Sequence, residues 1–260
     1  MTSICPESSV KTCQLLPAHL ECLAERYRIL APSRCRLALL DLRLLPPLIE
    51  QPGALAPLLA PDEREIFQRF RYPKRQVEWL GGRVAAKYCL HRLLAAEALP
   101  CTWQRYSILA DTHGRPCLEH VPADCPGAIV SISHSHGYAA ALACRTGSCG
   151  VDIQQLTPKL AGVAERFASG EELALIDSEL APLTRLGLIW AAKEAVKKCL
   201  LPDHPSFFGR IRLTRLEQDQ KTSGWRAQCR IAQPKPMAAT VHLAEVDGHL
   251  LACATGDAHA

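Results

Sequence analysis

Hydrophobic and polar positions follow an order along the chain that predicts a strand, then helices, then strands. The apolar run 36–42 is typical of a buried strand and precedes a proline-rich loop at 46–61. Between 76 and 99, apolar residues recur near helical spacing, which predicts one long helix with a basic face. Short apolar runs separated by Gly and Pro then predict strands at 106–109, 128–133, 138–144 and 151–153.

The same order recurs in the second half of the chain. Helices are predicted at 161–167, 170–180 and 184–201, followed by strands at 210–215, 224–231, 240–246 and 249–255. The segment 84–87 (VAAK) of the first long helix aligns with 190–193 (WAAK) of the second. Since Ala and Lys are common helix formers, this match alone leaves duplication and chance both open. At the next position only the second helix carries an acid, Glu194, where the first has Tyr88.

These patterns divide the 260 residues into three predicted regions. Residues 1–35 are predicted to be a variable N-terminal extension, 36–148 an N-terminal half, and 149–260 a C-terminal half. A chain of this length can bury a core in each half.

Composition narrows the classes of function. With 48% hydrophobic and 22% charged residues the chain is expected to be globular. Thirty Lys and Arg against 26 Asp and Glu give a net charge of +4, too small for a dedicated nucleic-acid binder. The apolar stretch 37–49 is interrupted by charges and prolines, and 1–17 lacks the apolar core of a signal peptide. We therefore expect no nucleic-acid partner, no membrane span and a cytoplasmic location.

The 13 cysteines do not resemble a disulfide framework or a zinc site, because their number is odd and no C-x-x-C pair occurs. We expect them to be mainly core residues in a reducing compartment.

Two acids are the strongest candidates for chemistry. Asp152 lies between Val151 and Ile153, so strand alternation points its carboxylate away from those apolar side chains. Glu194 and Lys198 are four residues apart on one helical face. Alone, the aspartate could bond nearby amides and the helix pair could be a surface ion pair. Together the two acids could hold a hard cation, with lysines holding its phosphate ligands.

Two polar segments could bind phosphate. The run 131–137 (SISHSHG) concentrates hydroxyls and imidazoles, and neither Cys nor acid lies at zinc-ligand spacing from its histidines. Residues 114–116 (GRP) place a glycine and an arginine in a turn. A plain polar turn and a plain hairpin remain alternatives for these segments.

In this order and spacing, the motifs resemble the Sfp-type 4′-phosphopantetheinyl transferases. They are Gly114-Arg115-Pro116, Ser133-His134-Ser135, Gly150-Val151-Asp152-Ile153 and Trp190-x-x-Lys193-Glu194-x-x-x-Lys198. The resemblance extends from Arg36 to the C-terminus and includes 70–87 and Arg166-Phe167-x-Ser169-x-x-Glu172.

The resemblance implies an α+β fold of two similar α/β halves related by a pseudo-two-fold axis, with coenzyme A between them. The implied reaction transfers the 4′-phosphopantetheine arm of coenzyme A to a serine of an apo acyl or peptidyl carrier protein, releasing adenosine 3′,5′-bisphosphate. A monomer would suffice. The alternative is a non-catalytic module of the same fold that binds coenzyme A or a carrier protein.

The resemblance also implies residue roles. Glu194, Asp152 and Lys198 would be catalytic, and Asp152 and Glu194 would bind Mg²⁺. The implied coenzyme A ligands are Arg115, Pro116, Ser133, His134, Lys193, Lys198, Arg83 and Lys87. Gln154 stands where the family commonly has a third acid, so either its amide oxygen or Glu172 would complete the metal shell.

Overall fold

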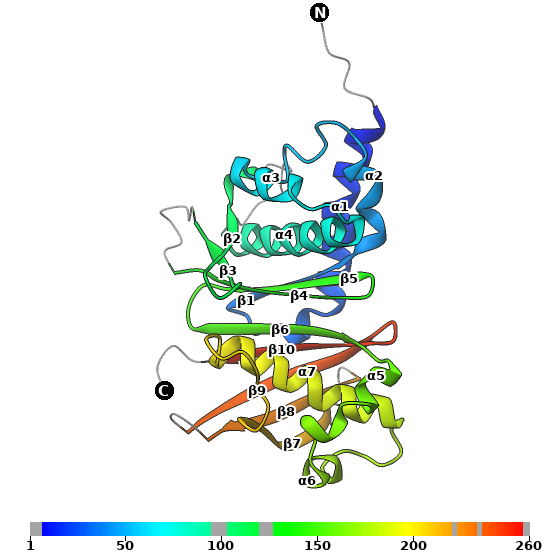
Figure 1. Ribbon diagram of the computed structural model, residues 1–260, viewed down its shortest axis with the longest axis vertical. Coiled ribbons are helices and arrows are strands. Elements are labelled where there is room, and N and C mark those ends of the chain that lie inside the picture. The colour runs from blue at the N-terminus through cyan, green and yellow to red at the C-terminus, as the bar shows by residue number, and fades with distance from the viewer. Residues whose placement is uncertain (1–6, 95–102, 120–126, 220–222, 233–235, 257–260) are drawn as a thin grey trace, which may run out of the picture.

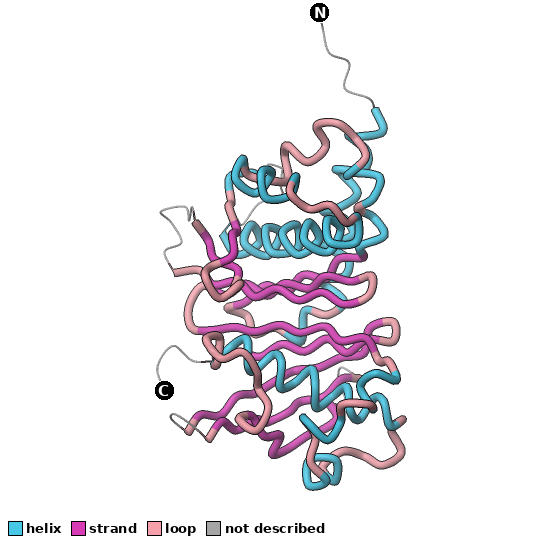
Figure 2. Tube along the Cα trace, viewed as in Figure 1, coloured by secondary structure: helices cyan, strands magenta, loops and turns pink. Residues whose placement is uncertain are grey.

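Two antiparallel sheets lie between two long helices in the computed structural model, which describes residues 7–94, 103–119, 127–219, 223–232 and 236–256 (Figure 1). In both halves of the chain a strand is followed by helices and then by further strands (Figure 2). The predicted α+β class is confirmed. No helix in the described ranges is long and apolar enough to cross a membrane.

The elements of the first half are α1 (Glu7–Arg26), η1 (Arg28–Leu30), β1 (Cys35–Asp41), η2 (Leu42–Leu44), α2 (Pro46–Ile49), α3 (Pro61–Gln68), α4 (Pro73–Leu94), η3 (Trp103–Arg105), β2 (Ile108–Ala110), β3 (Pro116–Leu118), β4 (Ile129–Ser135) and β5 (Tyr138–Cys144). Those of the second half are β6 (Ser148–Gln155), α5 (Pro158–Ala161), η4 (Ala164–Arg166), α6 (Gly170–Ala174), α7 (Pro182–Leu200), β7 (Ile211–Asp219), β8 (Gly224–Ile231), β9 (Met237–Val246) and β10 (His249–Gly256).

Strand order follows the same rule in both halves. The first sheet has the order β1-β5-β4, and β3 of the β2–β3 hairpin contacts β4. The second sheet has the order β6-β10-β9-β8-β7. The first strand of each half therefore pairs with the last strand of the same half, which pairs in turn with the strand before it.

Strand alternation separates the apolar side chains into three layers. One face of β1 and β5 packs under α4, and one face of β10 packs under α7. The opposite faces pack against each other and form an apolar layer between the sheets, with Leu37, Leu39, Val151 and Ile153 among its members. Figure 1 shows α4 on the side of the first sheet that faces away from the second sheet, and α7 lying across the second sheet.

A buried Glu–Lys pair, the glutamate clamp, ties each long helix to its neighbours. In the first half, Glu63 accepts hydrogen bonds from Lys87, from Ala60 N (2.8 Å) and from Ile108 N (3.0 Å). Lys87 also donates to Leu58 O at 2.8 Å. Both side chains of the ion pair are fully buried.

The second half repeats this arrangement bond for bond. Glu172 accepts from Lys193 (2.7 Å), from Ser169 N (3.0 Å) and from Leu213 N (2.7 Å). Lys193 donates to Phe167 O at 2.6 Å, five residues before the glutamate, as Leu58 lies five before Glu63. Because the bonds agree as well as the strand order, the aligned segments 84–87 and 190–193 hold equivalent positions.

The turns between β4 and β5 and between β9 and β10 show which residues of β1 and β6, the first strands of the two halves, are equivalent. His136–Gly137 and Asp247–Gly248 are both pairs of consecutive residues with positive φ. The residue after each turn pairs with Asp41 of β1 and with Gln155 of β6, respectively. Counting back three positions from these two residues places Ala38 of β1 where β6 carries Asp152.

Residues 7–26, predicted to belong to a variable extension, form helix α1. Its Leu16 and Leu20 are buried in the core beneath α4. His19 Nε2 accepts from Asp41 N at 3.3 Å on β1, and Glu21 pairs with Arg92 of α4 at 3.3 Å. The helix therefore packs as part of the first half. The short amphipathic pattern of its sequence did not predict this packing.

Several predicted boundaries change, among them those of the helix at 161–167, which is α5 followed by η4, and of the strand at 151–153, which is the longer β6. Helix α4 begins at Pro73, and the predicted extension to residue 99 lies outside the described residues. Strand β4 continues through Ser135, because the turn begins only at His136. The helix predicted at 170–180 ends at Ala174, and Asp177 then accepts from Glu179 N at 3.0 Å in a local turn that competes with helix.

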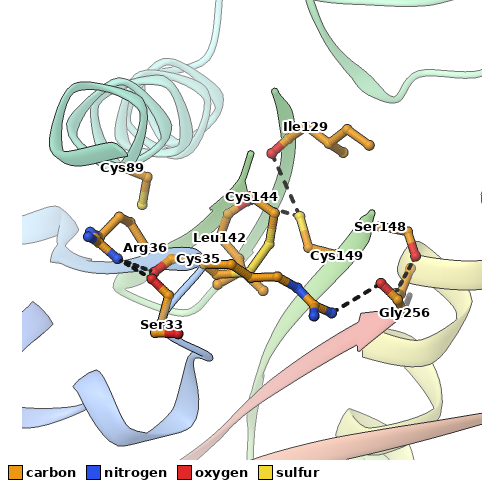
Figure 3. The surroundings of a disulfide bond; sticks show 12 residues. Ser33, Cys35, Arg36, Cys89, Ile129, Leu142, Cys144, Ser148, Cys149 and Gly256 are labelled. Atoms are coloured by element: carbon orange, nitrogen blue, oxygen red, sulfur yellow. Dashed lines mark hydrogen bonds between the residues drawn. A yellow bond between two sulfur atoms is a disulfide. The ribbon is translucent and has the colours of Figure 1, made fainter. Parts of the chain in front are cut away.

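A disulfide joins Cys35 of β1 to Cys144 of β5, as Figure 3 shows. The two residues lie opposite each other in the sheet although they are 109 apart in the sequence, so only strand pairing brings them together. Within the described ranges, five other cysteines are buried free thiols, as predicted. Sequence analysis did not predict this bond, because it depends on strand pairing and not on the spacing of the cysteines.

We expect Lys193→Met to lower the free energy of unfolding by about 3–5 kcal/mol, because it leaves the Glu172 carboxylate buried without a counter-charge. Urea unfolding followed by circular dichroism measures the change. Arg215→Met, which breaks an exposed ion pair with Glu217, serves as the control and should change little. Equal stability of the two variants would show that the clamp does not hold α7 in place.

Candidate functional site

The alternation of β6 directs Asp152 toward α7. Val151 and Ile153 belong to the apolar layer between the sheets, so the residue between them faces the other side. At Gly150 the backbone of α7 approaches so closely that a Cβ atom would lie 2.0 Å from Ala195 O. Only glycine permits this contact, which brings Glu194 and Lys198 of α7 to the face of β6 that carries Asp152.

Asp152 is 6% exposed, and its two oxygens differ. Oδ1 accepts hydrogen bonds from Ser133 Oγ and from Lys198 Nζ, both at 2.8 Å. Lys198 Nζ also donates to Val151 O at 2.9 Å. Oδ2 is buried and has no hydrogen-bond partner among the described residues. A buried carboxylate oxygen without a donor is costly, which indicates that this position serves a ligand.

Glu194 is the second acid of the site. Burial raises the pKa of its carboxyl above the ordinary value, and the negative charge of nearby Asp152 raises it further. Lys198 and Lys197 offset part of this shift. Two neighbouring acids that repel each other, Asp152 buried and Glu194 half-buried, are suited to a divalent cation, which removes the repulsion when it binds.

His134 lies on the opposite face of β4 from Ser133. Its Nδ1 is 3.9 Å from Glu78 Oε1 of α4. Burial lowers the pKa of His134, Glu78 raises it, and the positive charges of Arg75, Lys198 and Lys74 lower it again. The positive charges of Arg75, Lys198 and Lys74 thus act against protonation of His134. Sequence reasoning missed Glu78, whose only signal was its spacing of four from Lys74.

Lys87 and Lys193, predicted as coenzyme A ligands, instead lie in the core. Their ammonium groups are paired with Glu63 and Glu172 and are almost completely inaccessible to solvent. Both lysines stabilise the fold, and their burial keeps their ammonium groups away from a ligand. This corrects the roles that the resemblance implied for them.

Ser133, also predicted as a coenzyme A ligand, is 8% exposed and bonds within the protein. Its hydroxyl donates to Asp152 and accepts from Ile153 N at 3.3 Å. A serine hydroxyl carries one hydrogen, so none remains for a phosphate oxygen.

The remaining predicted ligands occupy the first half of the chain. Arg115 is half-buried, with ion pairs to Asp111 (2.5 Å) and to Asp203 (2.8 Å) in the loop after α7. Arg83 stacks on Trp79 at 4.4 Å, and burial lowers the pKa of its guanidinium to about 10. Pro116 begins β3. Of these three, only Arg115 connects the first half to the end of α7.

Gln154 shares with Asp152 the side of β6 that faces α7, by strand alternation. Its Nε2 donates to Gln155 O at 2.8 Å. Glu172, the alternative metal neighbour, lies in the buried clamp with both oxygens bonded to Lys193 and to backbone amides. Glu172 therefore belongs to the fold and not to the acid site.

A cavity of about 1510 Å³ lies beside α6 and the start of β7. Arg166, Leu175 and Arg212 contribute to its walls, whereas Asp152 and Glu194 do not. The cavity and the acid site are therefore at different places in the second half.

Comparison with known proteins bears on the same elements. A family model described as the 4′-phosphopantetheinyl transferase superfamily matches residues 148–254, which include β6 and α7. A holo-[acyl-carrier-protein] synthase from Streptococcus equi subsp. zooepidemicus is 32% identical over 84 residues, 32% of this chain and 70% of that protein. The chain belongs to the 4′-phosphopantetheinyl transferase superfamily. The predicted family and class of enzyme are confirmed.

Two further proteins are similar to this chain, one in sequence and one in structure. A holo-[acyl-carrier-protein] synthase from Geobacillus sp. is 35% identical over 85 residues, covering 32% of this chain and 70% of that protein. A crystal structure of the synthase from Bacillus anthracis in complex with CoA (3′,5′-ADP) covers 42% of this chain and 91% of that chain, with 20% identity and a TM-score of 0.38. The assignment to the superfamily depends on the sequence matches.

We expect the pH dependence of stability to report on Glu194 in magnesium-free buffer. Since the folded pKa is raised, the folded state holds this proton more tightly than the unfolded state. Stability from this group is complete below the unfolded pKa of about 4.5 and is lost as pH rises through the folded pKa. Glu194→Gln should remove this loss. The free energy of unfolding of the variant in urea, minus that of wild type, should therefore increase as the pH rises.

Glu165→Gln, at an exposed position, is the control. Its plot of the free energy of unfolding against pH should run parallel to that of wild type. If the Glu194→Gln curve is also parallel to wild type, the carboxyl of Glu194 is not perturbed by its surroundings.

Proposed function

We propose that this chain transfers the 4′-phosphopantetheine arm of coenzyme A to a serine of an apo carrier protein and releases adenosine 3′,5′-bisphosphate. The observation that carries the proposal is the buried, unpartnered Oδ2 of Asp152 beside Glu194, on the two elements within the superfamily match. Relatives of the superfamily are named holo-[acyl-carrier-protein] synthases, which supports a carrier protein as acceptor.

Asp152 and Glu194 are the candidate ligands of a magnesium ion, because the charge of Asp152 acts on the Glu194 carboxyl at close range. Among the described residues no group of three or more His, Cys, Asp or Glu side chains could hold a metal. Magnesium is commonly bound by one or two carboxylates together with substrate phosphates and water. Asp152 and Glu194 would hold it, with the amide oxygen of Gln154 as a neutral neighbour. When bound, the ion would neutralise charge on the pyrophosphate of coenzyme A.

The chain's own groups supply the remaining chemistry. Glu194, with its raised pKa, is suited to accept the proton of the carrier serine hydroxyl once its carboxyl is ionised. The serine oxygen then forms a bond to the β-phosphorus, and the bond from that phosphorus to the leaving bisphosphate breaks. Lys198 would place positive charge beside the pyrophosphate, because phosphoryl transfer depends mainly on alignment and charge neutralisation.

His134 and Arg115 are the proposed ligands of the adenosine 3′-phosphate, supported by their accessible positions. Arg83, being largely packed against Trp79, would contribute only positive potential. The acids of the site and Ser133 come from one chain, so a monomer would carry a complete site.

Mass spectrometry tests the proposal directly. An apo carrier protein incubated with this chain, coenzyme A and Mg²⁺ should gain the mass of one phosphopantetheine arm. A carrier that binds the chain without gaining mass would identify a non-catalytic module.

Asp152→Ala and Glu194→Ala should each reduce the rate of transfer by about 100-fold or more, because each removes one of two carboxylates from the site. The rate is measured by mass spectrometry of the carrier at saturating Mg²⁺, with folding checked by circular dichroism. Glu165→Ala, at an exposed position, should leave the rate unchanged. A folded Asp152→Ala protein with wild-type turnover would contradict the proposed site.

His134→Ala should reduce the preference for coenzyme A over dephospho-coenzyme A, which lacks the 3′-phosphate. The expected loss is about 1–3 kcal/mol, the contribution of a hydrogen bond to a charged group. The ratio of kcat/KM for the two substrates measures it. His136→Asn, at the nearby turn with positive φ, is a control that should keep the wild-type ratio. Equal ratios in the His134→Ala and wild-type proteins would remove His134 from this role.

A further inference from the structure

Three serines of β4 join the two halves of the chain. Ser131, Ser133 and Ser135 lie at alternate positions, so their side chains leave the strand on the same side. Their hydroxyl oxygens accept hydrogen bonds from the backbone amides of Val151 (3.1 Å), Ile153 (3.3 Å) and Gln155 (3.1 Å) on β6. All three bonds span 20 residues, so the two strands run side by side in a parallel register.

These hydroxyls take the place of the backbone carbonyls of a neighbouring strand. β4 and β6 belong to different sheets, and β6 is an edge strand, paired within its sheet only with β10. Without acceptors, the amides on its outer edge would be left unsatisfied in a buried position. Each serine therefore has the same task toward the backbone of β6.

Ser133 differs from the other two because its hydroxyl has a second partner. It donates to Asp152 Oδ1 at 2.8 Å while accepting from Ile153 N. Lys198 donates to the same oxygen at 2.8 Å and is anchored in turn on Val151 O. Two donors on Oδ1 fix the plane of the carboxylate and leave Oδ2 as the oxygen without a partner among the described residues.

We infer that Ser133 is a positioning residue that orients the Asp152 carboxylate toward the reaction site, and not a ligand of coenzyme A. The inference rests on the proposed function, since it supposes that Asp152 Oδ2 holds Mg²⁺. Groups that hydrogen-bond to a metal-binding carboxylate orient it and keep its affinity for the metal. The fixed strand register lets β4 perform this task from the other half of the molecule.

The experiment compares alanine variants of the three serines. Calorimetric titration of Mg²⁺ into the protein with coenzyme A, without carrier, reads metal binding independently of turnover. Ser133→Ala should weaken Mg²⁺ binding by about tenfold or more, because the carboxylate loses a donor that orients it. Ser131→Ala and Ser135→Ala remove one bond to β6 each but no bond to Asp152, so they should leave the binding constant unchanged.

A second measurement separates positioning from ligand binding. Ser133→Ala should keep the wild-type ratio of kcat/KM for coenzyme A over dephospho-coenzyme A. Weakening of Mg²⁺ binding to the same extent in all three variants would overturn the inference, because Ser133 would then act only as a link between strands. Unchanged Mg²⁺ binding with a reduced substrate ratio would overturn it in favour of a phosphate ligand.

Asp152→Asn separates failure of the inference from failure of the proposed function. If Asp152→Asn does not weaken Mg²⁺ binding, the proposed metal site is wrong, and the inference falls with it. If Asp152→Asn weakens binding and Ser133→Ala does not, only the inference is overturned. Should Ser133→Ala not fold, Ser133→Cys replaces it, because a thiol is a weak donor of similar shape and predicts the same direction of change.

Discussion

The buried glutamate clamp is the interaction on which the arrangement of both halves depends. In each half, a single carboxylate bonds the amide that begins its own helix, a lysine of the long helix and an amide of the following strand. The clamp thus fixes the long helix relative to the sheet it covers. In the second half, α7 carries Glu194 one residue after the clamping Lys193, so the bonds of Lys193 also fix the position of this acid.

The junction of β4 and β6 decides where the site forms. The serines of β4 satisfy the edge of β6, and Ser133 also bonds Asp152. On its other side β6 meets α7 at Gly150, close enough to exclude any side chain. Asp152 is consequently held between a strand of the first half and a helix of the second, and the same contacts leave its Oδ2 available to a ligand.

Both halves have the same architecture, but the acid site lies in the second half, because the equivalent positions of the first half carry other residues. Ala38 stands where β6 has Asp152, and Tyr88 stands where α7 has Glu194. On the first half, Tyr88 and Arg92 instead bond Glu21 of helix α1, which covers that face. The lysines of the two clamps, by contrast, are both retained, since each half needs its long helix fixed whether or not it bears acids.

The sequence by itself determined the α+β class, the repeated order of elements and the two acids, because alternation and helical spacing are local properties of the chain. It also identified Lys198 as a neighbour of Glu194 through their spacing of four.

The sequence did not distinguish a lysine that faces a ligand from one that faces the core. Lys87 and Lys193 match a binding motif, but their partners Glu63 and Glu172 are more than 20 residues away. Likewise the disulfide, the helix α1 contacts and the donor from Ser133 to Asp152 depend on strand pairing and on the meeting of two sheets. Tertiary structure decided these, because the free energy of a buried polar group depends on which donor or acceptor the fold brings within bonding distance.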